Sequence, residues 1–100
     1  MAYQVIYEIK GEGLKDSTNV FDENKPKGQK LINIFNNYVM NDWITQYDRK
    51  EITETHVEDT LVFVSKEKRD SWKTESEAAR GENDSDITNL TVTVMEEGEV

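Results

Sequence analysis

The segment KEKRDSWKTESEAARGENDSD, residues 66–86, separates two apolar segments, and Trp72 is its only bulky apolar side chain. Ser65, just before it, is a good helix N-cap, and side chains of opposite charge follow at three- and four-residue spacing, as on a solvated helix. We therefore predict a helix over residues 66–80, in preference to a long β-hairpin or mobile connection. Because Trp72 alone would anchor this helix, its removal is expected to melt residues 66–80 and little else.

The two apolar segments on either side are TLVFV (60–64) and ITNLTVTVM (87–95). The first is a continuous apolar run, typical of a buried strand, and the second alternates apolar and polar side chains, typical of a half-exposed strand. A helix between two strands predicts that they run parallel through a right-handed crossover and begin at the same end of the sheet. A hairpin would instead make them antiparallel.

The expected fold class is α+β, with a small three- to four-stranded sheet and helices on one face. The sheet uses the alternating segment 2–10 together with 60–64 and 87–95. Apolar side chains at helical spacing predict one long helix over residues 28–48. The expected core is Leu31, Phe35, Val39, Val62 and Leu90. Residues 1–100 are expected to form a single domain, with 96–100 as a frayed acidic tail.

Composition narrows the function further. The 100 residues include no cysteine, which excludes disulfides and thiolate metal sites. No segment is apolar enough for a membrane span, and the first ten residues lack a signal-peptide core, so a cytoplasmic protein is expected, in the host cytoplasm if the protein is viral. Residues 1–50 are neutral, and residues 51–100 carry the whole net charge of −9. Nucleic acid is therefore an unsuitable ligand, and a basic partner is favoured.

Acidic side chains precede both predicted strands and are expected to gather as a rim at one end of the sheet. Their interpretation as a partner-binding surface competes with a purely solubilising role. The first functional hypothesis is a non-enzymatic, phage-type inhibitor that occupies a basic nucleic-acid-binding surface of a host protein by charge mimicry. The candidate partner-binding residues are Glu51, Glu54, Glu58, Asp59, Glu82, Asp84 and Asp86.

Two alternatives remain open. One is a small dimeric α+β enzyme or ligand-binding protein, with an aromatic-lined pocket between helix and sheet formed by Tyr7, Tyr38, Trp43 and Phe63. The other is a structural or assembly subunit that uses a free sheet edge, through which a homodimer is also expected. No catalytic residue, cofactor or metal site is predicted. His56, between Glu54 and Glu58, would share one strand face with them, but three ligands of this kind are a weak metal signal.

Overall fold

The computed structural model describes residues 1–12, 26–80 and 88–100. The strands and helices follow one another along the chain in the order βαββαβ. Their bounds are β1 (Tyr3–Glu12), α1 (Pro26–Met40), β2 (Ile44–Thr53), β3 (His56–Phe63), α2 (Lys66–Arg80) and β4 (Thr88–Glu99). This order is that of the ferredoxin-like fold, in which each helix crosses from one strand to another. The predicted α+β class is confirmed.

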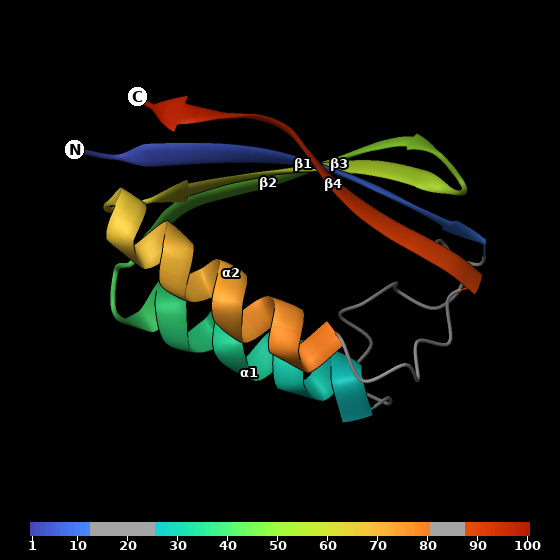
Figure 1. Ribbon diagram of the computed structural model, residues 1–100, viewed down its shortest axis with the longest axis horizontal. Coiled ribbons are helices and arrows are strands. Elements are labelled where there is room, and N and C mark those ends of the chain that lie inside the picture. Colours follow the sequence, from blue (N-terminus) through green and yellow to red (C-terminus); the bar gives the residue numbers. More distant parts are fainter. Residues whose placement is uncertain (13–25, 81–87) are drawn as a thin grey trace.

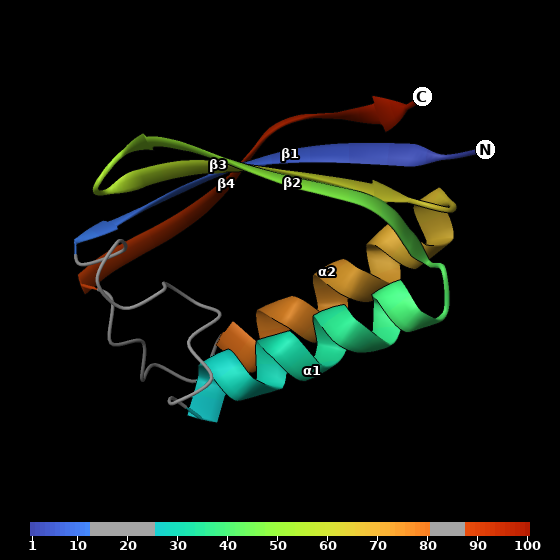
Figure 2. The same cartoon turned by 180° about the vertical axis from the view of Figure 1, so that it is seen from behind.

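The four strands form one antiparallel sheet in the order β2-β3-β1-β4. β3 and β4 flank β1 and both pair antiparallel with it, so they run in the same direction. The predicted parallel relation between these two strands is therefore confirmed, and both begin at the same end of the sheet. Both helices lie on one face of the sheet, and none of the described helices or strands covers the other face, which is called the uncovered face below (Figures 1 and 2).

The core lies between the helices and the covered face of the sheet. Its most completely buried side chains are Val5 and Phe63 on the sheet and Tyr38 on α1. The Tyr38 hydroxyl donates a hydrogen bond to the Glu75 carboxylate, which joins α1 to α2. Burial and this hydrogen bond raise the pKa of Tyr38 well above its ordinary value, so the hydroxyl stays protonated.

Helix α2 matches the predicted bounds of 66–80, and the hairpin alternative is excluded. The predicted cap is present, because the Ser65 Oγ accepts a hydrogen bond from the Lys68 backbone N–H at 3.3 Å. The anchor is stronger than expected. Trp72 is 5% exposed and its ring contacts Phe35, Tyr38 and Phe63, so α2 belongs to the main core.

The predicted helix over 28–48 is wrong beyond Met40. Asp42 adopts a left-handed conformation with φ of 58°. The Trp43 N–H donates to the Tyr38 carbonyl at 2.8 Å, and the Asp42 N–H donates to the Val39 carbonyl at 3.1 Å. This pair of hydrogen bonds is a Schellman motif, which satisfies the last carbonyls of α1 and reverses the chain. The chain therefore turns at Trp43 and enters the next strand at Ile44, and neither residue extends the helix.

β2 is the strand that the sequence interpretation missed. It is an edge strand, and Ile44 is its only fully buried residue. Without a buried alternating face it lacks the period-two signal, and its apolar side chains were assigned to the preceding helix. Residues 96–100 were expected as a frayed acidic tail, but residues 96–99 pair with β1 within β4, where Tyr3 lies opposite Glu99.

The expected core residues have mixed outcomes. Leu31 and Val62 are buried, as predicted. Phe35 is only partly buried, and Val39 is 41% exposed, so its assignment to the core is wrong. The side chain of Leu90 lies outside the described residues. Val39 follows the helical spacing, but the preceding residue, Tyr38, is the one that is buried at this end of α1, so Val39 lies outside the buried stripe of the helix.

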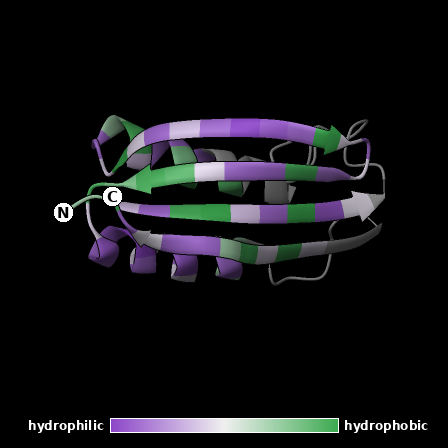
Figure 3. Cartoon of the chain, turned by 90° about the horizontal axis from the view of Figure 1, so that it is seen from above, coloured by the Kyte–Doolittle hydropathy of each residue, from purple (hydrophilic) through white to green (hydrophobic). Residues whose placement is uncertain are grey.

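Hydrophilic residues predominate along the edge strand β2, and hydrophobic and hydrophilic residues are interspersed along β1 (Figure 3). Glu8 lies on the uncovered face, with its carboxylate 3.3 Å from the Lys10 ammonium and 3.5 Å from the His56 imidazole. Of the helices in the described part of the chain, none is long and apolar enough to cross a membrane.

Candidate functional site

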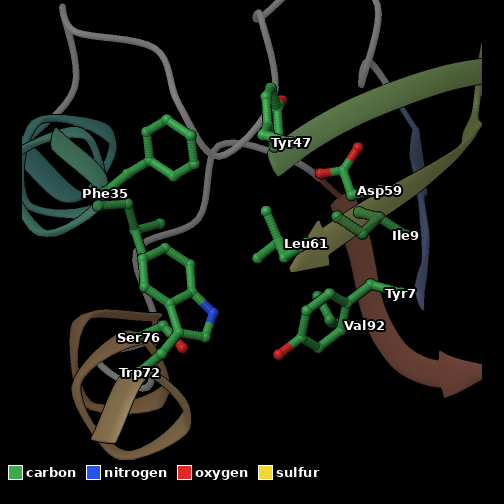
Figure 4. A pocket seen from close by; sticks show the side chains of 10 residues that line it. Tyr7, Ile9, Phe35, Tyr47, Asp59, Leu61, Trp72, Ser76 and Val92 are labelled. Atoms are coloured by element: carbon green, nitrogen blue, oxygen red, sulfur yellow. The ribbon is translucent and has the colours of Figure 1, made fainter. Parts of the chain in front are cut away.

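An open pocket of about 470 Å³, counting the space at its mouth, lies between the covered face of the sheet and the two helices (Figure 4). All four strands and both helices contribute to its walls. Its lining is mostly apolar and aromatic, which is typical of sites for small molecules. The lining residues are Tyr7, Ile9, Leu31, Phe35, Tyr47, Asp59, Leu61, Trp72, Ser76 and Val92.

The two-residue periodicity of the strands explains which of their side chains form the sheet wall of this pocket. Side chains two residues apart share one face, so Tyr7 and Ile9 of β1 face the helices together, and so do Asp59 and Leu61 of β3. Tyr47 lies opposite Leu61 in the register of β2 and β3. The sheet wall therefore combines aliphatic side chains with two tyrosines and one carboxylate.

The helix side follows the four-residue repeat, with Leu31 and Phe35 on α1 and Trp72 and Ser76 on α2. The Phe35 ring packs edge-on against Tyr47 at a centroid distance of 4.9 Å. It also packs edge-on against Trp72, at 6.2 Å. These three rings join β2, α1 and α2 into one aromatic wall.

Asp59 is the one acidic side chain in the lining, and it is 4% exposed. Arg49, on the neighbouring strand, donates to it through both ends of its guanidinium, from Nε to Oδ1 and from one terminal nitrogen to Oδ2, each at 2.6 Å. A bidentate pair of this kind cancels the carboxylate charge locally. The pocket is therefore electrically close to neutral although the chain as a whole is acidic.

Tyr47 is the half-exposed member of the aromatic wall. Burial and the neighbouring Asp59 carboxylate raise its pKa, so its hydroxyl stays protonated at neutral pH and can donate a hydrogen bond. Ser76 is buried, and its hydroxyl donates to the Lys73 carbonyl at 3.4 Å. Most of the pocket surface is apolar, with polar atoms at a few fixed points.

The sequence interpretation assigned only one of these lining residues to a pocket. Of the four aromatic residues predicted to line a pocket, Tyr7 does so. Tyr38 and Phe63 are fully buried in the core instead. Trp43 packs at the margin of the core, with the Lys68 ammonium 3.7 Å from its ring centroid. The alternation of β1, which also places Ile9 beside Tyr7, is the sequence signal that could have located the pocket.

The predicted acidic rim is spread over different surfaces in the described part of the chain. Glu51 is exposed on β2, and Glu54 is exposed in the turn before β3. Glu58 lies on the uncovered face, opposite Glu8, whereas the adjacent Asp59 is buried on the covered face. The remaining rim residues, Glu82, Asp84 and Asp86, lie outside the described residues.

The histidine site also differs from its expected geometry. The carboxylate near His56 belongs to Glu8 on β1, because Glu54 lies in the turn rather than on the strand. Within residues 1–12, 26–80 and 88–100, no group of three or more histidine and acidic side chains is arranged to hold a metal ion.

Comparison with known proteins gives matches in structure. No protein-family model matches the sequence, and no curated protein sequence matches it. The structure of Rv0793 from Mycobacterium tuberculosis aligns with a TM-score of 0.59 and 14% identity, over 96% of this chain and 94% of that one. A protein from Chloroflexus aurantiacus J-10-fl, provisionally named an antibiotic biosynthesis monooxygenase, aligns with a TM-score of 0.47 and 15% identity, over 100% and 98%. The first likeness shows a shared fold, and the second is too distant to support an argument.

The hypothesis that this chain is an acidic viral inhibitor that mimics nucleic acid is therefore wrong. Along almost its whole length the chain has the fold of the Rv0793 structure, and that fold encloses an aromatic pocket here. Asp59, a central residue of the supposed rim, is buried and already paired with Arg49. The expectation that the chain is not an enzyme rested on the same hypothesis and is corrected with it. These findings support the alternative of an enzyme or ligand-binding protein.

Proposed function

We propose that this chain is a small-molecule enzyme or ligand-binding protein whose ligand occupies the pocket between the sheet and the two helices. The observation that carries the proposal is the pocket itself, an open space between the sheet and the two helices with walls of aromatic and aliphatic side chains. Pockets that are lined mainly by hydrophobic and aromatic side chains, with a few polar groups, are typical sites for small molecules. The apolar walls favour a flat, largely apolar ligand, because its contact with Phe35 and Trp72 removes apolar surface from water.

Filling the pocket is expected to weaken the binding of a small aromatic molecule. Val92 lines the pocket from β4 and is partly buried, so the variant Val92→Trp places a large ring inside it. The neutral fluorophore 1-aminoanthracene should bind the wild-type protein with increased emission. Its affinity should fall by about tenfold or more in the variant, because ring and probe compete for the same space.

The matched control is Thr93→Trp. Thr93 is the next residue of β4, is exposed, and is directed to the uncovered face of the sheet. This variant adds the same ring outside the pocket and should bind the probe as the wild type does. Equal affinities for all three proteins, or no binding by the wild type, would overturn the proposed function. Mass spectrometry of the same incubations would show whether a bound compound is also converted.

Self-association through a sheet edge stays a prediction. β2 and β4 are the two edge strands, and β4 exposes the apolar side chains of Val94 and Met95. Exposed apolar edges promote pairing, and a lysine at such an edge opposes it. We expect sedimentation velocity to give a dimer for the wild type and a monomer for Met95→Lys. A wild-type protein that stays monomeric at all concentrations would contradict the prediction.

The cytoplasmic location predicted from the sequence also stays a prediction, which cell fractionation would test. Its host-cell part depended on the viral hypothesis, which the fold comparison has corrected.

A further inference from the structure

The indole nitrogen of Trp72 is a hydrogen-bond donor that faces the pocket. In Figure 4 the five-membered ring of Trp72 points from α2 toward the sheet wall, with its nitrogen directed into the space between them. The residue is 5% exposed, and no hydrogen bond from its Nε1–H is seen among the described residues. This nitrogen is not one of the fully enclosed atoms of the described residues that lack a hydrogen bond, which are His56 Nε2 and Arg69 Nε. A ligand that enters the pocket would withdraw this N–H from water, and a tryptophan N–H withdrawn from water usually makes a hydrogen bond.

The opposite wall offers no net charge to a ligand. Asp59 is the one charged residue among the lining residues, and Arg49 occupies both of its carboxylate oxygens at 2.6 Å. A charged ligand would lose its hydration on entering this site and would find no unpaired countercharge in the lining. The lining therefore favours an uncharged ligand over a charged one.

Together these observations define the ligand class. Resting on the proposed function, we infer that the pocket selects an uncharged aromatic molecule that carries a hydrogen-bond acceptor, and that the acceptor takes the Nε1–H of Trp72. The rings of Phe35 and Tyr47 stack on or edge against the ligand, since they already form one wall with Trp72. The indole thus fixes the orientation of a ligand that the apolar walls alone would hold in several ways.

The test uses two probes of nearly the same shape, 2-acetylnaphthalene and 2-isopropenylnaphthalene. The first has a carbonyl oxygen where the second has a methylene group, so only the first accepts a hydrogen bond. The protein contains two tryptophans, and Trp43 lies outside the pocket lining. The indole N–H signal of Trp72 can therefore be assigned in ¹H–¹⁵N spectra as the one that persists in Trp43→Phe.

We expect the ketone to move the Trp72 indole proton signal downfield and the alkene to leave it nearly unchanged, with the Trp43 signal unaffected by both. In Trp72→Phe, which keeps an aromatic ring but has no donor, affinity for the ketone should fall about three- to tenfold more than affinity for the alkene. Dividing the fall in ketone affinity by the fall in alkene affinity removes the effect of the lost contact area, because both probes lose the same contacts. The signal shift in the wild type does not depend on the folding of that variant.

A third comparison addresses charge. 2-Naphthamide should bind at least about tenfold more tightly than 2-naphthoate, which has the same shape but is an anion. Equal signal shifts for ketone and alkene, or a preference for the anion, would overturn the inference while leaving the proposed function intact. If neither naphthalene probe binds the wild type, the proposed function fails and the inference fails with it.

Discussion

Replacing Trp72 with alanine is expected to lower the free energy of unfolding by about 3–5 kcal/mol and to destabilise the whole domain. Trp72 is 5% exposed and contacts rings from α1 and β3, so its removal leaves a cavity between both helices and the sheet. This expectation replaces the local melting of residues 66–80 that the sequence suggested. Denaturant unfolding, monitored by far-ultraviolet circular dichroism, measures the change.

Hydrogen exchange distinguishes the two expectations. In Trp72→Ala, amide protection should fall in β1, β3 and α1 as well as in α2, because all of them depend on the same core. Trp43→Ala is the matched control, since Trp43 is only partly buried and lies at the margin of that core. Trp43→Ala should lower the free energy of unfolding clearly less than Trp72→Ala does. Loss of protection confined to residues 66–80 would show that the sequence-based expectation was right.

Replacing Arg49 with methionine is expected to cost about 3–5 kcal/mol, because it leaves the buried carboxylate of Asp59 without its partner. Arg49 connects the edge strand β2 to β3 through this pair, so β2 should loosen first. Methionine retains much of the side-chain volume, which keeps the loss of packing small. Urea unfolding of the variant at neutral pH measures the effect.

The double variant Arg49→Met/Asp59→Leu is the control for this second large effect. It removes both charges and fills the site with apolar atoms, so it should recover most of the lost stability. If the double variant is as unstable as Arg49→Met, the cost comes from lost packing rather than from an unpaired buried charge. Gln46→Met, on the same strand with an exposed side chain, should change stability by less than about 1 kcal/mol.

The pocket could be predicted only in part. Its existence between helix and sheet was among the alternatives, and Tyr7 was named as a lining residue. Phe35 was expected in the core, yet it is partly buried and lines the pocket. Asp59 was expected on an exposed rim. Its real position depends on the register that places Arg49 opposite it, and no local pattern specifies that register across two strands.

Local sequence patterns were enough to predict the elements that depend on residues close to them in the sequence. Alternation identified β1 and β4, and the Ser65 cap with mixed charges at helical spacing identified α2 and the direction of the strands on either side of it. Tertiary structure decided what depends on distant partners. β2 is a strand because it pairs with β3, although only Ile44 of its residues is buried. Trp72 belongs to the core because α1 and β3 pack against it, and Asp59 is neutralised because the strand register places Arg49 opposite it. Residue spacing in the sequence does not specify these contacts, since the partners are distant along the chain.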